Sequence, residues 1–322
     1  MRQHIEYATA PDGARIAYAV IGKGTPVVRA SHWLTHLEYE LDSPVWRHLL
    51  LGMASRHKLV RYDGRGTGLS QRDAVEISMD RWVSDLECVV DCLSLERFIL
   101  LGVSQGGAIA IEYAARHPER VSHLIIHGAY ARGFLHRDDP DKQRQFVELN
   151  RALIRQGWGS EHDAYRQWFT SQFIPGGTAE QARWFNDLER VSATPEMMEK
   201  FVVELSTIDV ADLLPKVTAP TLVTHCKGDV RVPFALGQEI AAGIPGAKFV
   251  PLDSSAIMFS SRTNPRRGFS STRLRRFSAT RPSKERSRGR QPSRSGRNGA
   301  LWRSSEAGGS KRSRFWRRSQ AP

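Results

Sequence analysis

The sequence predicts an α/β protein in which helices flank a mostly parallel sheet. Short apolar runs typical of buried strands alternate along the chain with segments whose apolar residues recur every three or four positions. In addition, the apolar run 97–103 is followed almost at once by a small-residue helix, 108–115. Such alternation requires crossover connections between strands, and crossovers make neighbouring strands parallel.

Eight strands are expected, each bounded by turn residues. The first two form a hairpin, because Pro11-Asp12-Gly13 between them is a turn sequence. The other six are short segments that each contain consecutive Val, Ile, Leu or Phe residues, as buried strands do. The expected strands lie at 6–13, 14–21, 25–31, 57–63, 97–103, 121–127, 219–225 and 248–252.

The helices are recognised by their period and by capping residues. In 79–93 the apolar residues recur at steps of three and four, which predicts a face packed on the core. Thr178 and Gln181 form a capping box, and Pro195 after Thr194 takes a first helical position. The expected helices lie at 46–52, 79–93, 108–115, 146–158, 164–173, 178–191, 194–205 and 235–243.

No strand of any length is predicted from about 132 to 214, between the sixth and seventh strands. We therefore expect an inserted helical cap there. Its aromatic residues are candidates for lining an apolar substrate pocket, although helix packing is the expected role of most of them. They are Trp158, Trp168, Phe169, Phe173, Trp184 and Phe185.

The net charge of +13 is unevenly distributed. Residues 255–322 hold 19 of the 47 Lys and Arg but only 2 of the 34 Asp and Glu, a net of +17, which leaves −4 for 1–254. We divide the chain accordingly into a globular domain, 1–254, and a basic tail, 255–322. The tail is rich in Ser, Arg, Gly and Pro and has no hydrophobic period, so we expect it to be disordered.

Two interpretations of the tail stay open. An arginine-rich segment with interleaved Phe and Trp would bind nucleic acid or anionic membrane weakly, with strong salt dependence. A GC-rich gene read out of frame also yields Arg, Ser, Gly and Pro, and we favour this shifted frame, with nucleic acid bound only non-specifically. One choice of codons for 255–265 reads, in the neighbouring frame, as a segment containing Asn-His-Val-Leu-Leu.

Composition disfavours several classes of protein. No apolar run approaches the roughly 18 residues of a membrane span and no signal segment begins the chain, so a cytoplasmic location is expected. The 3 cysteines argue against a disulfide framework. Cys88 and Cys92 could share a metal, but no second ligand pair follows, so we interpret them as buried small apolar residues. No metal or organic cofactor is expected, and the oligomeric state is left open.

The turn from Gly102 to Gly107 carries the main functional signal, because it fits Gly-x-Ser-x-Gly around Ser104. A serine raised on a sharp strand-to-helix turn needs small neighbours, since a Cβ there would collide with the opposing backbone. Gly102 and Gly106 meet that need. The pattern also occurs in ordinary turns, but a strand before it and a helix after it favour a nucleophile above a helix N-terminus.

These features together resemble the α/β-hydrolase superfamily over residues 1 to about 254. The resemblance rests on the strand order, the loop 63–70, the Ser104 turn, the helical insertion and Gly228-Asp229-x-x-Val232-Pro233. It is strongest to a subgroup often joined to nucleotide-cyclase or helix-turn-helix regulator domains, through the segments 43–48, 115–122 and 173–175. It implies cleavage of an ester, thioester, amide or activated carbon–carbon bond in a small molecule with an apolar part.

The resemblance also implies roles for individual residues. Ser104 would be the nucleophile, and Asp229 would orient and stabilise a catalytic imidazole, although a plain Gly-Asp turn is the structural alternative. The oxyanion hole would consist of the backbone N–H of Gln105 and one from His32 or Trp33. The side chain of His32 is disfavoured as a base, because its loop is expected to face the oxyanion side of the serine.

The third member of the triad is missing. The superfamily places its histidine after the eighth strand, whereas all 11 histidines of this chain lie at or before His225. His225 itself is expected to be buried or solvated rather than aimed at Ser104. Loss of a triad histidine costs about 10⁶-fold in turnover, so we expect an impaired serine hydrolase. The alternatives are a non-catalytic ligand-sensing protein of the same fold and a nucleic-acid-binding protein that acts through its tail.

Overall fold

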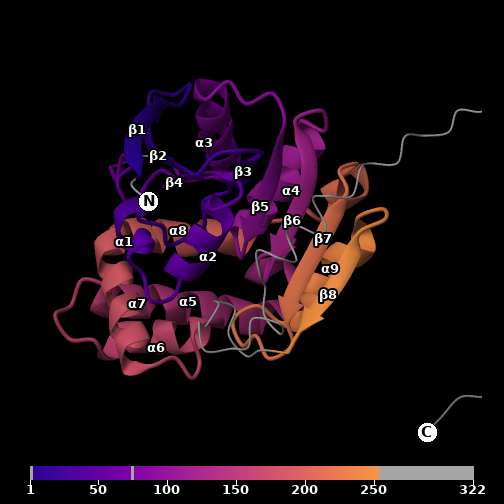
Figure 1. Ribbon diagram of the computed structural model, residues 1–322. Helices are drawn as coiled ribbons and strands as arrows, with labels where there is room; N and C mark the ends of the chain where they lie inside the picture. Colours follow the sequence, from indigo (N-terminus) through magenta and orange to yellow (C-terminus); the bar gives the residue numbers. More distant parts are fainter. Residues whose placement is uncertain (1–2, 74–75, 254–322) are drawn as a thin grey trace, which may run out of the picture. The chain divides into compact units, whose positions relative to one another are not determined.

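The centre of the molecule is an eight-stranded mixed sheet in the computed structural model, which describes residues 3–73 and 76–253 (Figure 1). The strand order is β1-β2-β4-β3-β5-β6-β7-β8. β2 pairs antiparallel with β1 and β4, and all other neighbours pair parallel. The strands are β1 (His4–Thr9), β2 (Arg15–Ile21), β3 (Pro26–Arg29), β4 (Lys58–Tyr62), β5 (Phe98–Val103), β6 (Val121–His127), β7 (Thr221–Cys226) and β8 (Lys248–Leu252).

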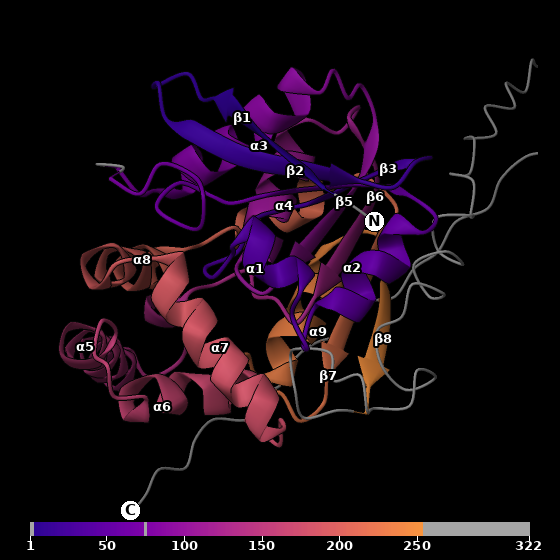
Figure 2. The same ribbon diagram turned by 60° about the vertical axis from the view of Figure 1, so that its left-hand side comes forward.

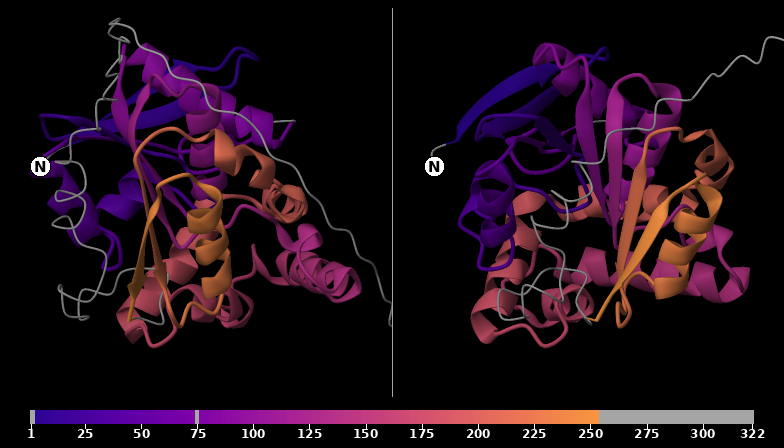
Figure 3. Two further views of the ribbon diagram at one scale, coloured as in Figure 1. Left: turned by 90° about the vertical axis from the view of Figure 1, so that its right-hand side faces the viewer. Right: turned by 45° about the vertical axis from the view of Figure 1, so that its right-hand side comes forward.

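Helices cover both faces of this sheet. With the sheet seen nearly edge-on, α2 lies on one side, and α4 and α9 lie on the other (Figure 3). β5 and β7 are buried along their whole length, which is typical of parallel strands covered on both faces. The helices are α1 (Leu37–Leu41), α2 (Arg47–Ala54), α3 (Met79–Cys92), α4 (Gly106–Arg116), α5 (Pro140–Gly157), α6 (Ala164–Phe173), α7 (Ala179–Ser192), α8 (Pro195–Thr207) and α9 (Phe234–Gly243).

Four of these helices, α5 to α8, lie between β6 and β7 in the chain and gather beside the carboxyl ends of the parallel strands (Figure 2). The capping box of α7 forms as predicted: Thr178 N donates to Gln181 Oε1 at 3.0 Å, and Gln181 N donates to Thr178 Oγ1 at 3.2 Å. Gln181 Nε2 also donates to the carbonyl oxygen of Pro44 at 3.4 Å. The glutamine of the capping box therefore also ties the helical insertion to the core.

The glycine-rich loop after β4 is a structural turn. Asp63 Oδ2 accepts hydrogen bonds from the backbone N–H of Leu37 at 3.1 Å and of Leu69 at 2.9 Å. Gly68 has a φ of +55°, and a Cβ on it would lie 2.1 Å from Asp63 Oδ2. The loop is thus organised by its own carboxylate.

Several details differ from the sequence expectations; β1, for example, ends at Thr9 rather than at 13. Helix α1 was not expected, because five residues are too few to show a helical period. Helix α5 begins at Pro140 rather than at 146: Asp139 Oδ1 accepts from Lys142 N at 3.2 Å, which makes Asp139 the N-cap. Neither Cys88 nor Cys92 is fully buried: Cys88 is half-buried, and Cys92 is exposed because it lies at the end of α3.

The predictions about the tail lie outside the described residues. These are the disorder of 255–322, its shifted reading frame and the domain boundary at 254, all of which stay predictions. Within 3–73 and 76–253, none of the helices is both long and apolar enough to cross a membrane.

Candidate active site

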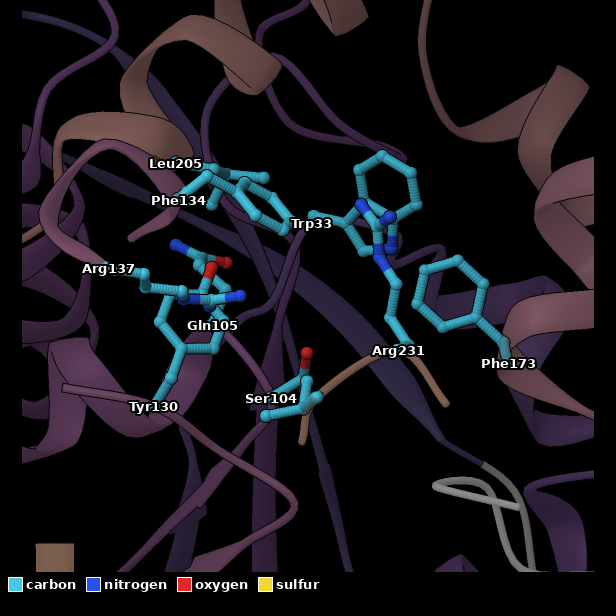
Figure 4. Close-up of a pocket in the computed structure, with 10 residues that line it drawn as sticks. Trp33, Ser104, Gln105, Tyr130, Phe134, Arg137, Phe173, Leu205 and Arg231 are labelled. Atoms are coloured by element: carbon cyan, nitrogen blue, oxygen red, sulfur yellow. The ribbon is translucent and has the colours of Figure 1, made fainter. Parts of the chain in front are cut away.

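Ser104 lies on a sharp turn between β5, which ends at Val103, and α4, which begins at Gly106. Its φ is +52°, a left-handed conformation that residues other than glycine adopt rarely. The turn is held on both sides, because Ser104 N donates to the carbonyl oxygen of His127 at 3.0 Å and Gly107 N donates to that of Ser104 at 2.9 Å. The turn presents the hydroxyl of Ser104 to a pocket (Figure 4).

The glycines around Ser104 are required by close backbone approaches. A Cβ on Gly102 would lie 2.6 Å from Gly107 Cα and 2.7 Å from the carbonyl oxygen of Gly106. A Cβ on Gly106 would lie 2.7 Å from the carbonyl oxygen of Ser31. Contacts below 3.0 Å at a Cβ force the surroundings to move, so this is the crowding that the sequence pattern predicts.

The pocket that Ser104 faces is built jointly by the core and by the segment between β6 and β7 (Figure 4). It holds about 340 Å³ of space that no atom fills, including the part open to solvent. The residues that line it are Trp33, Ser104, Gln105, Tyr130, Phe134, Arg137, Phe173, Leu205, Arg231 and Val232. Its walls are thus largely aromatic, with two arginines among them.

Of the three residues predicted for the oxyanion hole, two line the pocket and His32 does not. Gln105 and Trp33 line the pocket, and the first N–H groups of a helix such as α4 lack an intrahelical acceptor. The ring of His32 packs instead against Trp46, with centroids 5.6 Å apart, and its Nε2 lies 3.9 Å from Glu40 Oε1. Burial lowers the pKa of His32 to about 3, so the imidazole is neutral. The side chain of His32 is therefore not one of the groups around Ser104.

Asp229 is buried at the turn after β7, and its two carboxylate oxygens have different surroundings. Oδ1 accepts hydrogen bonds from the backbone N–H of Arg231 at 2.9 Å and of Val232 at 2.8 Å. Oδ2 is buried and has no hydrogen-bond partner among the residues that the structure describes. Burial raises the pKa of Asp229 to about 6. One oxygen thus fixes the carboxylate, and the other is left for a donor.

His225 is close to this carboxylate but is directed elsewhere. Its Nε2 lies 2.8 Å from the carbonyl oxygen of Val232, so this nitrogen carries the proton and donates. The other face of the ring is closely packed, because a Cβ on Gly237 would lie 2.2 Å from Nδ1. Burial lowers the pKa of His225, and the residue does not line the pocket. It is buried, as one of the two sequence expectations stated.

Most of the candidate aromatic residues of the insertion pack rather than line the pocket. Of the six, Phe173 alone faces the space beside Ser104. Trp158 and Phe169 pack against the ring of Trp33, with ring centroids 5.9 and 6.1 Å from that of Trp33. Trp184 stacks on Tyr39 at 5.2 Å.

The two charged residues of the pocket, Arg137 and Arg231, were missed by sequence reasoning. Arg231 could have been noticed, because it lies two positions after Asp229 in the motif already singled out. Arg137 follows the short helical turn Phe134–His136, in a stretch without periodic pattern, and gave no comparable signal.

Comparison with known families decides the class of the protein. A family model described as the alpha/beta hydrolase fold matches residues 37–262. The chain belongs to the α/β-hydrolase fold family. The expected resemblance to the superfamily and the predicted α/β-hydrolase fold of the described residues are therefore confirmed.

Individual α/β-hydrolase relatives agree with this assignment. A protein of Azorhizobium caulinodans that carries the name carbamate hydrolase RutD is 30% identical over 258 residues, covering 78% of this chain and 91% of that protein. Karrikin insensitive 2 receptor B of Petunia hybrida is 23% identical over 240 residues, covering 73% and 85%. The solved esterase EaEST of Exiguobacterium antarcticum is 26% identical, has a TM-score of 0.70, and covers 85% of this chain and 99% of its own.

Proposed function

We propose that this α/β-hydrolase cleaves a small molecule with an apolar part by means of Ser104. The hydroxyl oxygen attacks the carbonyl carbon of an ester, thioester, amide or activated carbon–carbon bond and forms an acyl-enzyme, and the leaving group departs with a proton. Water then hydrolyses the acyl-enzyme and regenerates the serine. The observation that carries the proposal is the left-handed backbone of Ser104, the one serine among the described residues that lines this pocket.

Charge development at the carbonyl oxygen would be stabilised by backbone donors. The N–H of Gln105 at the start of α4 and the N–H of Trp33 after β3 are the proposed pair, since both residues line the pocket with Ser104. The N-terminal end of α4 favours negative charge at the same place. Asp229 is the proposed acid, and its open Oδ2 is where an imidazole N–H would donate.

The proposed mechanism lacks its base in this chain. No histidine lines the pocket within the described residues, and none follows His225 in the sequence. Without a base the serine hydroxyl keeps its proton, and turnover falls by about 10⁶-fold, to what the oxyanion hole and binding supply. We therefore propose a serine hydrolase that is impaired in the present sequence.

A covalent serine probe tests this proposal without requiring turnover. The full chain is incubated with an alkyl fluorophosphonate, and adduct formation is followed by intact mass and peptide mapping. A slow, stoichiometric adduct on Ser104 that is absent from the Ser104→Ala variant is expected. An adduct elsewhere, or equal labelling of Ser104→Ala, would exclude Ser104 as the nucleophile.

A ligand-sensing function is the second candidate, because the base is missing and one relative is named a receptor. It predicts saturable binding of a small molecule that survives Ser104→Ala and produces no product. Labelling of Ser104 together with slow product formation from para-nitrophenyl esters would favour the hydrolase instead.

A further inference from the structure

Two arginines line the Ser104 pocket without a carboxylate partner. Arg231 and Arg137 form no ion pair with any acidic residue that the structure describes. Among the described residues, the arginines that are almost fully buried are paired: Arg65 Nη2, for example, lies 2.7 Å from Asp85 Oδ1. Arg137 and Arg231 are half-buried and have no such partner, so the pocket can accept a counter-charge from outside the protein.

Aromatic rings surround the guanidinium of Arg231. Its central carbon lies 5.3 to 5.8 Å from the ring centroids of Trp33, Phe134, Phe146 and Phe173. Its Nη1 donates to Gln172 Oε1 at 3.1 Å, which fixes one edge of the group. Burial lowers the pKa of Arg231 to about 10, so it remains a cation at neutral pH. The rings orient this cation but do not neutralise it.

Arg137 supplies a second positive charge at the same pocket (Figure 4). Its guanidinium carbon lies 5.0 Å from the ring of Tyr130 and 4.4 Å from that of Phe134. Its Nε donates to the carbonyl oxygen of Arg132 at 3.1 Å. The hydrogen bond uses a neutral acceptor, so the charge of Arg137 is not compensated either.

The acidic residues nearest to Arg231 do not offset these charges. Burial raises the pKa of Glu189 well above its usual range, which favours the neutral acid. Asp229 carries at most one negative charge, and its Oδ1 is occupied by the backbone N–H groups of Arg231 and Val232. With Arg137 and Arg231 both charged, the pocket keeps a positive excess beside the nucleophile.

We propose that the Ser104 pocket selects substrates that carry a carboxylate, bound by Arg231 with Arg137 as a second cation. A guanidinium matches a carboxylate in shape and donates in parallel to both oxygens, and apolar walls strengthen the attraction. The apolar part of the substrate lies along Trp33, Phe173 and Leu205. Cleavage of such a substrate rests on the proposed function of Ser104. Binding of the carboxylate by the two arginines does not.

A purely structural role for Arg231 makes a different prediction. Its contacts join the core residue Trp33 to Gln172 and Phe173 of α6, so it also bridges the core and the helical insertion. If bridging were its whole function, replacement would change the binding of charged and neutral ligands alike. A carboxylate site requires the ratio of the two affinities to change.

Two matched ligand pairs measure that ratio and tell on which side of the scissile bond the carboxylate lies. Monobenzyl glutarate carries it on the acyl side, and the butanoate ester of 4-(hydroxymethyl)benzoate carries it on the leaving side. Each is compared with the primary amide of its free acid group, which is neutral and of the same shape. Affinities are measured by titration calorimetry on the full chain with Ser104→Ala, which prevents turnover.

In at least one pair the carboxylate is expected to bind about tenfold or more tightly than its amide, since charge-assisted hydrogen bonds supply that much. Arg231→Met should reduce the preference to below about twofold while leaving the affinity for the amide within about twofold. Arg231→Lys should keep part of the preference. Arg144→Met removes an exposed arginine of α5 and should change nothing, which controls for the overall charge.

Three results would overturn the inference: equal affinities in both pairs, binding of neither carboxylate, or a preference that survives Arg231→Met. If Arg231→Met does not fold, as judged by thermal unfolding, Arg231→Gln removes the charge while retaining a donor toward Gln172. The proposed function is tested separately, by fluorophosphonate labelling of the unmodified chain, and it fails if Ser104 is not labelled. A carboxylate preference without labelling of Ser104 leaves this inference standing and removes the hydrolase proposal.

Discussion

His225 Nε2 lies 3.6 Å from Asp229 Oδ2 but gives its proton to the carbonyl oxygen of Val232 at 2.8 Å. The histidine is thus a neighbour of the carboxylate rather than its partner. Burial lowers the pKa of His225 and raises that of Asp229 to about 6, so this pair does not ionise cooperatively as a salt bridge. Asp229 consequently keeps an acceptor for a donor that the described residues do not provide.

Asp229→Asn is expected to stabilise the protein at pH 7. The pKa of this carboxyl is about 6 in the folded protein against 3.8 in the unfolded chain. Between these values the folded state binds more protons, so this group's contribution to stability falls as pH rises from about 4 to 6. Asparagine removes that cost, a gain of about 1–3 kcal/mol at pH 7 that disappears toward pH 4. Urea unfolding at both pH values measures it, and an equal gain at both would contradict the shift.

Ser104→Gly is expected to be more stable than Ser104→Ala, because only glycine adopts a φ of +52° without strain. The relief of strain is partly offset by the greater freedom of glycine in the unfolded chain, which leaves about 0.5–1 kcal/mol. The two variants lack the hydroxyl equally, so each is the control for the other. Equal midpoints in urea unfolding would argue against a left-handed backbone at this position.

Glu40→Gln is expected to destabilise the protein by about 3–5 kcal/mol, because it leaves Arg29 and Arg61 as buried, unpaired cations. All three side chains are almost completely inaccessible to solvent. The control is Asp42→Asn two residues further on, which breaks an exposed pair with Arg47 and should cost less than about 1 kcal/mol. Urea unfolding measures the loss of stability in each variant. Similar losses for Glu40→Gln and Asp42→Asn would mean that the buried cluster of Glu40, Arg29 and Arg61 does not hold α1 in place.

Downstream of the codon for Leu252, the gene is expected to encode Asn-His in a neighbouring frame, across the codons for 256–258. Sequencing from that codon to the one for Pro265 and translating all three frames tests this. A chain that continues in the restored frame should hydrolyse para-nitrophenyl esters about 10⁴-fold faster or more, and Ser104→Ala should abolish the gain. If no frame supplies a histidine, its absence is genuine and the ligand-sensing function gains support.

Any nucleic-acid binding is expected to come from residues 255–322 and to be non-specific. Their net charge is +17, so affinity for a random duplex should fall by about 10³-fold or more between 50 and 200 mM salt. Truncation before Ser255 should abolish the binding, which electrophoretic mobility shifts measure. Tight binding to one sequence at the higher salt concentration would instead make recognition of nucleic acid a function of the tail.

The elements of the fold could be predicted because each leaves a local pattern. The period of α3, the capping box at Thr178 and the glycines around Ser104 are properties of short segments, and all appear where expected. Helix α1 leaves no such pattern, since Glu40 holds it in place through Arg29 and Arg61 on two strands that lie far apart in the sequence.

The composition of the pocket was harder to predict for the same reason. Ser104, Gln105 and Trp33 are brought together as expected, whereas the side chain of His32 turns toward Glu40. That direction depends on a buried ion cluster formed by other elements. The presence of Arg137 depends on how the insertion docks, which the period of its helices does not specify.

The residues that line the pocket come from distant parts of the chain, so the pocket can form only late in folding. Trp33 follows the third strand and Arg231 the seventh, and β6 and β7 pair only after the chain has looped through the whole insertion. Closing such a long loop has a large entropic cost, and contacts of high sequence separation form slowly. During synthesis Ser104 leaves the ribosome well before Arg231. A nascent chain therefore exposes Ser104 first without its surroundings, and the pocket forms only when the last parallel strands join the sheet.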